Sequence, residues 1–221
     1  MAKLKWDQTG ERLYETGIDR GVLYVYDTGS STYGTGVAWN GLTAVNETPS
    51  GAESNPQYAD NIKYLDLYSA EEFGATIEAF TYPAEFEECD GSAELVKGVT
   101  IGMQNRKMFG FSYRTLIGND TEGTDHGYKL HLVYGAKASP SEKSRSTVND
   151  SPEAVTFSWE VTTTPVTVES FKPTSHLIID STKADPAKLA ELEKKLYGDD
   201  SAGTPSLPLP DEVKTLMTPG E

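Results

Sequence analysis

The feature that most constrains the fold is a strict two-residue alternation that recurs three times between Met108 and Val161. Alternation over seven or more residues places one row of side chains in a core and the other row outside it, as in a half-buried β-strand. The inward rows are rich in aromatic and β-branched residues, which favour strands. We therefore predict three strands of one sheet. The rows expected to face inward are Phe109, Phe111, Tyr113, Thr115 and Ile117 in the first strand, Tyr128, Leu130, Leu132 and Tyr134 in the second, and Val155, Phe157, Trp159 and Val161 in the third. The rows expected to face outward are Gly110, Ser112 and Arg114 in the first strand, Lys129 and His131 in the second, and Thr156, Ser158, Glu160 and Thr162 in the third.

Further strands are expected on both sides of this segment. Short apolar or alternating runs predict strands at Gly21–Asp27, around Val37 and Trp39, at Ile62–Tyr68, at Phe73–Tyr82 and at His176–Asp180. The stretch from Leu42 to Asp60 contains the turn signals Thr48-Pro49-Ser50-Gly51 and Asn55-Pro56, and it predicts a long surface loop.

One helix is expected, over residues 186–197. Asp185 is a good N-cap, Pro186 is favoured at the first helical position, and Gly198 ends the helix. Leu189, Leu192 and Leu196 form its apolar stripe. The predicted organisation is an N-terminal arm (1–20), one mainly β domain (21–198) that is an antiparallel sandwich or distorted barrel, and a C-terminal arm (199–221) in which Pro208 and Pro210 disfavour regular structure.

Composition limits the classes of function. The 221 residues carry a formal net charge of −15, which argues against binding nucleic acid by neutralising phosphates. Cys89 is the only cysteine, so no intrachain disulfide can form, and the neighbouring acids predict a raised thiol pKa rather than a catalytic thiolate. No apolar run approaches the length of about 20 residues that a membrane span needs, and no signal segment is evident at the N-terminus.

Charge is distributed unevenly along the chain. One stretch contains acids with no Lys or Arg between them, and a later stretch has an excess of basic residues. These are either two solvated faces or complementary patches that meet between neighbouring copies and set the register of an assembly. The acidic residues are Asp66, Glu71, Glu72, Glu78, Glu85, Glu87, Glu88, Asp90 and Glu94, and the basic residues are Arg106, Lys107, Arg114, Lys129, Lys137, Lys143 and Arg145.

No catalytic, cofactor or metal motif is evident. His126, His131 and His176 lack the spacing of a zinc-binding helix, and we expect His131 on the outward row of its strand. Asp120, Glu122 and Asp125 could crowd around a cation, but they lack the calcium-loop pattern and are expected to form turns. Glu78 and Glu160 raise the alternative of a jelly-roll glycosidase, but both fit ordinary outward strand positions.

Several runs of residues resemble the major tail proteins of long-tailed bacteriophages of the siphophage type. The resemblance covers most of the chain from Gly21 onward, and its strongest segments are Met108–Asp120, His126–Pro140, Asn149–Thr164 and Leu207–Val213. It is made by runs of residues and not by a short functional motif.

This resemblance implies a tail-tube fold whose six copies form a ring with a continuous inner barrel, and rings that stack into a conduit for the genome. It also implies that the protein belongs to the virion tail, assembles in the bacterial host cytoplasm, and meets tape-measure and terminator or tail-tip proteins, with DNA only in transit. Under this interpretation Leu42–Asp60 and Asp199–Glu221 link neighbouring copies. The acidic residues between Asp66 and Glu94 then either line the lumen of the tube or meet the basic segment of a neighbouring copy. The alternative from another class is a β-sandwich carbohydrate-binding module that uses Trp39 and nearby tyrosines as a sugar platform.

Overall fold

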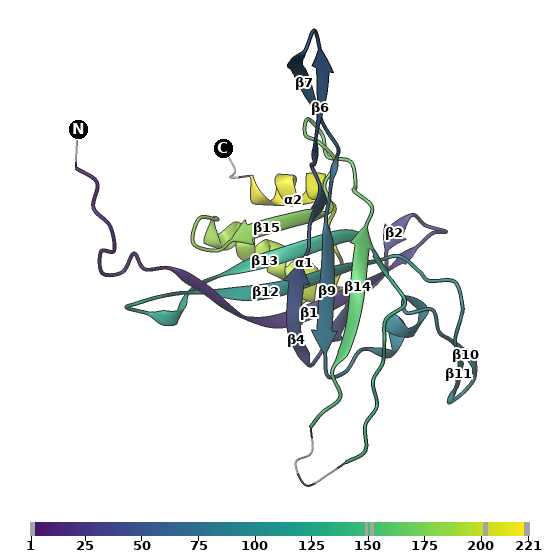
Figure 1. Cartoon of the computed structure of the whole chain (residues 1–221). Helices are drawn as coiled ribbons and strands as arrows, with labels where there is room; N and C mark the ends of the chain where they lie inside the picture. The colour runs from purple at the N-terminus through teal and green to yellow at the C-terminus, as the bar shows by residue number, and fades with distance from the viewer. Residues whose placement is uncertain (1–2, 149, 151–152, 201–202, 219–221) are drawn as a thin grey trace.

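The main sheet of the protein is antiparallel and is folded into two halves (Figure 1). This architecture is seen in a computed structural model that describes residues 3–148, 150, 153–200 and 203–218. One half has the order β2–β1–β12–β13, with β3 beside β1 and β15 beside β13, and the other half continues as β14–β9–β4. The mainly β, antiparallel fold class is confirmed. The strands are β1 (Tyr14–Asp27), β2 (Thr32–Tyr33), β3 (Val37–Trp39), β4 (Leu42–Glu47), β9 (Gly74–Ala79), β12 (Phe109–Asn119), β13 (Gly123–Ala138), β14 (Phe157–Thr163) and β15 (His176–Asp180).

Strand β13 makes the corner between the two halves. Residues 129–133 pair with β15, whereas residues 136–138 pair with β14. Gly135 lies between these segments with φ of 62°, and a Cβ atom there would lie 2.1 Å from the carbonyl oxygen of Thr164. The register with β12 shifts at the same point, as in a bulge that lets a strand change sheets. A glycine is therefore required at this corner.

The two halves enclose an aromatic core. Trp39, Phe86, Phe111 and Trp159 are buried and pack mostly edge to face, with ring centroids 4.5 Å apart for Trp39 and Phe86 and 5.1 Å apart for Phe86 and Trp159. Phe86 comes from the short helix η1 (Ala84–Glu88), which closes one end of the core. Each such ring buries about 150–250 Å², so this cluster supplies much of the apolar burial of the fold.

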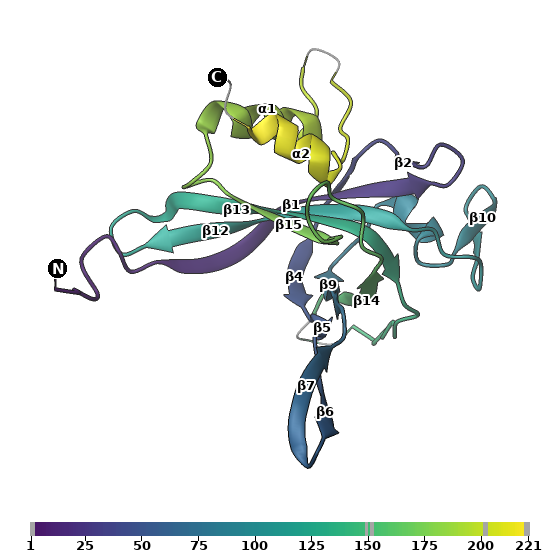
Figure 2. The ribbon, with the colours of Figure 1, turned by 90° about the horizontal axis from the view of Figure 1, so that it is seen from above.

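Two helices cover the opposite face of the β1–β12–β13–β15 half (Figure 2). Helix α1 (Pro186–Tyr197) begins where predicted, and the Asp185 carboxylate accepts hydrogen bonds from the backbone N–H groups of Ala187 (2.9 Å) and Lys188 (3.1 Å). Helix α2 (Pro210–Met217) packs beside it. The phenol of Tyr134 donates to the carbonyl oxygen of Pro208 at 2.8 Å. The second core lies under both helices and contains Val22, Tyr24, Leu130, Leu132, Tyr134, Leu189, Leu192, Leu196, Leu207 and Val213.

The β1–β12–β13–β15 half is therefore covered on both faces, by the helices on one side and by the β14–β9–β4 layer on the other. This corrects the prediction that one row of each strand faces solvent. His131 was expected to face outward, but it is only 4% exposed because its face of β13 meets the aromatic core. Ser112, also expected to face outward, is buried beside the helices. The large residues of β12 face one core, and Leu130 and Leu132 of β13 face the other.

Three further segments differ from the predictions. Strand β1 begins at Tyr14, not at Gly21, and pairs with β12 from there. The segment 42–60 is not a loop, because it contains three strands, one of which (β4) belongs to the main sheet. In the C-terminal segment, Leu207 and Val213 are buried in the second core, so residues 203–218 dock on their own domain. Of the rest of the predicted arm, residues 201–202 and 219–221 lie outside the described residues.

Three small two-stranded sheets stand outside the main sheet. The pair β6–β7 forms a long hairpin that projects away from the domain (Figures 1 and 2). The strands β5 and β8 connect it to the domain, and β10–β11 forms a separate hairpin beside η1. Their bounds are β5 (Ser50–Gly51), β6 (Ser54–Ala59), β7 (Ile62–Tyr68), β8 (Glu71–Glu72), β10 (Ala93–Val96) and β11 (Val99–Ile101).

Candidate functional site

The projecting hairpin, residues 54–68, is called the arm below, and it exposes large hydrophobic side chains along its length. Every residue of β6 is exposed, and so is every residue of β7 except Asp66. A two-stranded hairpin has no core of its own and is at best marginally stable in water. The exposed hydrophobic residues are Tyr58 (70%), Ile62 (63%), Tyr64 (69%), Leu65 (40%), Leu67 (55%) and Tyr68 (67%).

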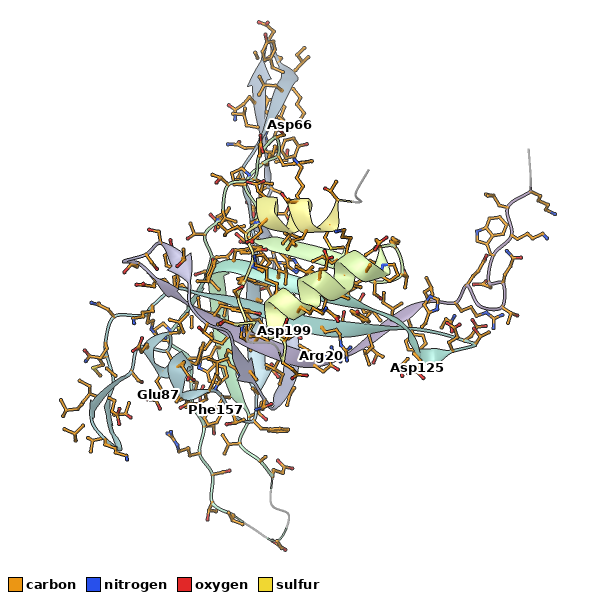
Figure 3. All side chains as sticks on the ribbon, turned by 180° about the vertical axis from the view of Figure 1, so that it is seen from behind. Arg20, Asp66, Glu87, Asp125, Phe157 and Asp199 are labelled. Atoms are coloured by element: carbon orange, nitrogen blue, oxygen red, sulfur yellow. The ribbon has the colours of Figure 1, made fainter. Side chains whose placement is uncertain are left out.

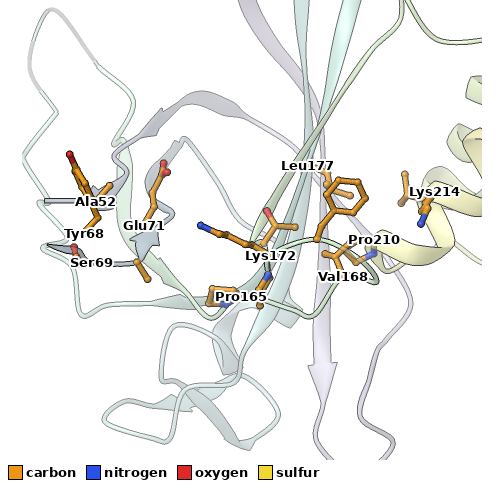
Figure 4. A pocket seen from close by; sticks show the side chains of 15 residues that line it. Ala52, Tyr68, Ser69, Glu71, Pro165, Val168, Lys172, Leu177, Pro210 and Lys214 are labelled. Carbon is orange, nitrogen blue, oxygen red and sulfur yellow. The ribbon is translucent and has the colours of Figure 1, made fainter. Parts of the chain in front are cut away.

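A groove continues from the base of the arm to helix α2 (Figure 4). It has a volume of about 1320 Å³. Tyr68 and Glu71 lie at its arm end, Pro210 and Lys214 lie at its helix end, and Phe171 on its wall is strongly exposed. Most of the lining is apolar, so the groove and the arm form one continuous surface that a partner could cover.

The sheet β14–β9–β4 presents a polar outer face and incompletely paired edges. Strand β4 ends the sheet, and β9 is its only strand partner among the described residues. Strand β14 pairs with β9 throughout but with β13 only through residues 161–163. Unpaired edges of this kind are ready to accept a strand from another chain. The outward residues are Ala44, Asn46, Thr76, Glu78, Ser158, Glu160 and Thr162, with two acids and no basic residue.

The predicted acidic residues do not form one surface. Asp66 lies on the arm and Glu87 lies on η1, on opposite sides of the domain (Figure 3). Asp66 pairs with Lys63 at 2.6 Å, and Glu78 accepts a hydrogen bond from Asn46 at 3.4 Å. The other members are placed as follows: Glu71 and Glu72 on β8, Glu85 and Glu88 on η1, Asp90 just after η1, and Glu94 on β10.

Several predicted basic residues pair with acids of the same chain. Asp90 is buried between Arg106, at 3.4 Å, and Lys143, and Lys107 pairs with Glu88. Arg114 and Lys129 pair with acids of β1: Arg114 with Asp19 at 2.5 Å, and Lys129 with Glu15. Lys137 lies near the end of β13 and Arg145 lies in the segment that follows it. An interface role for the two predicted patches thus remains a prediction, with Glu88 and Asp90 already paired within the chain.

Strand pairing brings together two histidines that lie 45 residues apart in the sequence. The imidazoles of His131 on β13 and His176 on β15 stack with centroids 5.4 Å apart, and Nδ1 of His131 lies 3.2 Å from Nε2 of His176. Glu47, the last residue of β4, places Oε1 3.4 Å from Nδ1 of His131 and 4.0 Å from Nε2 of His176. Sequence spacing gave no indication of this cluster, because its members come from three strands and only the sheet topology joins them.

Polar neighbours surround this cluster. The phenol of Tyr113 donates to Glu47 Oε1 at 2.7 Å, and its ring stacks on His131 at 4.5 Å. The hydroxyl of Thr115 donates to Glu15 at 2.6 Å and lies 3.1 Å from Nε2 of His131. Burial, together with the nearby His176, lowers the pKa of His131 to about 4, and burial lowers the pKa of His176 as well. Both imidazoles are therefore neutral at neutral pH.

The remaining candidate residues have structural roles. Burial, then the charge of Glu88, raises the pKa of Cys89 to about 12, as the sequence predicted in direction. The side chain of Asn119 accepts from the backbone N–H groups of Thr121 (3.1 Å) and Glu122 (2.6 Å), and Glu122 in turn bonds to Nδ1 of His126 at 2.6 Å. Asp120 accepts from the backbone N–H of Gly10 at 2.9 Å. These contacts hold the β12–β13 turn in place.

Comparison with known proteins gives only distant likenesses. No protein-family model matches the chain, and no curated protein matches it. Similar solved structures include an extracellular contractile injection system, the PVC sheath–tube complex in the extended state, with 14% identity, 73% of this chain and 88% of that chain covered, and a TM-score of 0.31. The 6-fold symmetrised baseplate of the anti-feeding prophage is 7% identical, with 73% of this chain and 93% of that chain covered and a TM-score of 0.35. The PVC sheath/tube terminator in the extended state is 13% identical, with 80% of this chain and 99% of that chain covered and a TM-score of 0.28. Across the described residues, no helix is long and apolar enough to cross a membrane.

Proposed function

We propose that this chain is a non-catalytic structural subunit that assembles with copies of itself into the tube of a phage-type tail. In this proposal six copies form a ring, rings stack into a tube, and the tube conducts the genome into a host cell. The protein would then be part of the virion tail and would meet tape-measure and terminator or tail-tip proteins at the ends of the tube. The sequence resemblance to siphophage major tail proteins suggested this function, and the surfaces of the fold support a self-assembling role.

The observation that carries the proposal is the arm. It exposes six large hydrophobic side chains on a hairpin that has no core of its own. A chain that worked alone would expose a patch of this kind at a cost in solubility, whereas a chain that assembles buries it against a neighbour. The apolar groove at the base of the arm adjoins this surface, so one neighbouring copy could cover both.

The open edges of β14–β9–β4 support ring closure. If β4 of one copy pairs beside β14 of the next, the sheets of successive copies join and the exposed backbone groups are satisfied. The polar outer face of this sheet would then line the ring with Glu78 and Glu160 from every copy. An acidic wall repels DNA phosphates and so allows the polymer to pass without binding.

The structure does not support the sugar-binding alternative in the form predicted. Trp39 was to be the platform, but it is 2% exposed, packs against Phe86 and Trp159, and donates its indole N–H to the carbonyl oxygen of Thr81 at 2.9 Å. A buried ring cannot stack on a carbohydrate.

The test is to delete the arm and image the product. The resemblance implied that 42–60 and 199–221 link neighbouring copies. Deleting either segment is not a usable test, because β4 belongs to the main sheet and α2 to the second core, and we expect the domain to unfold without them. Replacing residues 54–68 by a two-residue turn leaves both cores intact. We expect the wild-type chain to form tubes at high concentration in negative-stain micrographs, and the arm deletion to give a folded particle without tubes. Normal tubes from the deletion, or a wild-type chain that stays monomeric, would contradict the proposal.

A further inference from the structure

We propose that Glu47, His131 and His176 bind one divalent transition-metal ion of the zinc class, at the point where β4 meets β13 and β15. Two imidazole nitrogens and one carboxylate oxygen are ligands that Zn²⁺ accepts in proteins. The three strands come from both halves of the folded sheet, so the ion would tie the two layers together. This inference is independent of tube formation, because it concerns the folded chain itself.

The distances between the three ligand atoms suit such an ion. They are 3.2 Å between the two nitrogens, and 3.4 Å and 4.0 Å from Glu47 Oε1 to His131 Nδ1 and His176 Nε2. A triangle with these sides has a circumscribed radius of about 2.1 Å, so one point lies at the usual Zn–N and Zn–O bond length from all three atoms. The hollow beside the cluster leaves room for a fourth ligand such as water.

Hydrogen bonds orient His131 for this role. Glu15 is a carboxylate that also bonds to Lys129, so it can only accept, and the single hydroxyl hydrogen of Thr115 is donated to it. The Thr115 oxygen is then left to accept from Nε2–H of His131. This arrangement leaves Nδ1 of His131 without a proton, so its lone pair can accept; the atom lies 3.2 Å from Nε2 of His176 and 3.4 Å from Oε1 of Glu47. A histidine whose second nitrogen is held through such a chain to a carboxylate is typical of metal sites.

His176 and Glu47 complete the set. Without an ion, Nε2–H of His176 donates to Nδ1 of His131; when the ion binds, that proton transfers to Nδ1 of His176 and the freed Nε2 lone pair becomes a ligand. The phenol of Tyr113 donates to the liganding oxygen of Glu47 and so fixes its carboxylate.

An ion can reach the site from solvent. The Glu47 side chain is 38% exposed, and it borders a hollow of about 370 Å³ between β1, β4, β12 and β13 that also touches Glu15, Thr115 and His131. The two carboxylates, Glu15 and Glu47, give this hollow a negative charge that only Lys129 offsets among the described neighbours. Glu47 also directly precedes the segment that leads to the arm, so a bound ion would fix the base of the arm to the domain.

The experiment titrates ZnCl₂ into the full chain after treatment with a chelator and dialysis, using isothermal calorimetry and thermal unfolding. We expect one Zn²⁺ per chain and a rise in melting temperature with zinc. Two single substitutions, Glu47→Gln and His176→Gln, each remove one proposed ligand. Glu47→Gln keeps an oxygen that can accept from Tyr113. Each substitution should weaken zinc binding at least ~100-fold, and Thr115→Val should weaken it ~10-fold, because loss of an outer partner typically costs about 10–100-fold. His126→Gln, at the β12–β13 turn, is the matched control and should bind zinc as the wild type does.

A second readout does not depend on the variants. Histidine-selective NMR of the wild-type chain should show the resonances of His131 and His176 shifting with zinc while that of His126 stays unchanged. The inference would be overturned if zinc does not bind at one ion per chain, if Glu47→Gln and His176→Gln bind as tightly as the wild type, or if only His126 responds.

Discussion

The β12–β13 hairpin and the arm are built from the same kind of sequence and have opposite surroundings. Both are antiparallel pairs in which aromatic and aliphatic residues recur along the strands. In β12–β13 almost every large side chain is buried, on one face by the β14–β9–β4 layer and on the other by the helices. In the arm every large hydrophobic side chain is exposed.

The difference shows that alternation identifies a strand but not what covers it. For β12–β13 the cover comes from segments of the same chain that lie far away in sequence. For the arm no cover is present among the described residues, so we infer that a second copy supplies it. Substitutions in the two hairpins should therefore separate stability from assembly.

The largest effect is expected in the aromatic core. Trp159→Ala removes a fully buried ring that contacts Trp39, Phe86 and Phe157, and it should lower the free energy of unfolding by about 3–5 kcal/mol. Urea denaturation followed by circular dichroism measures this change. Tyr58→Ala removes an exposed aromatic ring of the arm. If it lowered the free energy of unfolding as much as Trp159→Ala does, the contrast between the two hairpins would be contradicted.

The next effect is expected at the corner of β13. Gly135→Ala places a methyl group against the carbonyl oxygen of Thr164 at a left-handed backbone position, so it should cost at least about 1–3 kcal/mol. Gly98→Ala in the β10–β11 hairpin is the matched control: its φ of 81° is also left-handed, but no atom lies within 4 Å of the added Cβ. The melting temperature should fall further for Gly135→Ala. Equal losses would show that the backbone angle alone, and not the strand corner, requires glycine at 135.

Much of the fold followed from local sequence signals. The alternation in 109–134, the Asp185-Pro186 start of α1 and its leucine stripe predicted the right elements, because these signals depend on neighbours within a few residues. The signals failed where distant segments decide. His131 was assigned to solvent because its own strand reads as polar there, yet β4 and β15 bring Glu47 and His176 beside it.

The segment 42–60 failed for a different reason. Its turn-forming residues lie between or within the short strands β4, β5 and β6 and do not form one long loop. Pro56 lies inside β6, a position that is tolerated in a two-stranded hairpin. The metal-ligand candidates could not be found from spacing, since no short-range pattern relates Glu47, His131 and His176. Only the pairing of β13 with β15, and the approach of β4 to them, defines that cluster.

A smaller effect is expected at the start of the helical cover. Asp185→Ala removes the acceptor for two backbone N–H groups and should reduce stability by about 1 kcal/mol. Lys188→Ala, which breaks only an exposed pair with Glu191 in the same helix, should cost about 0.3–0.5 kcal/mol. Thermal unfolding of both variants measures the difference, and a larger loss for Lys188→Ala would argue against capping as the cause.

The smallest effect on stability, and the largest on assembly, is expected in the arm. The double substitution Tyr64→Ala and Leu67→Ala removes exposed surface, so the free energy of unfolding of the dispersed protein should stay within about 0.5 kcal/mol of the wild type. Tubes should be lost in negative-stain micrographs, because these side chains would be buried only between copies. Lys63→Ala, also in the arm, breaks only the exposed pair with Asp66 and should leave tubes intact. If the double variant loses stability as the Trp159 variant does, the arm is covered by its own chain, and the distinction between the two hairpins fails.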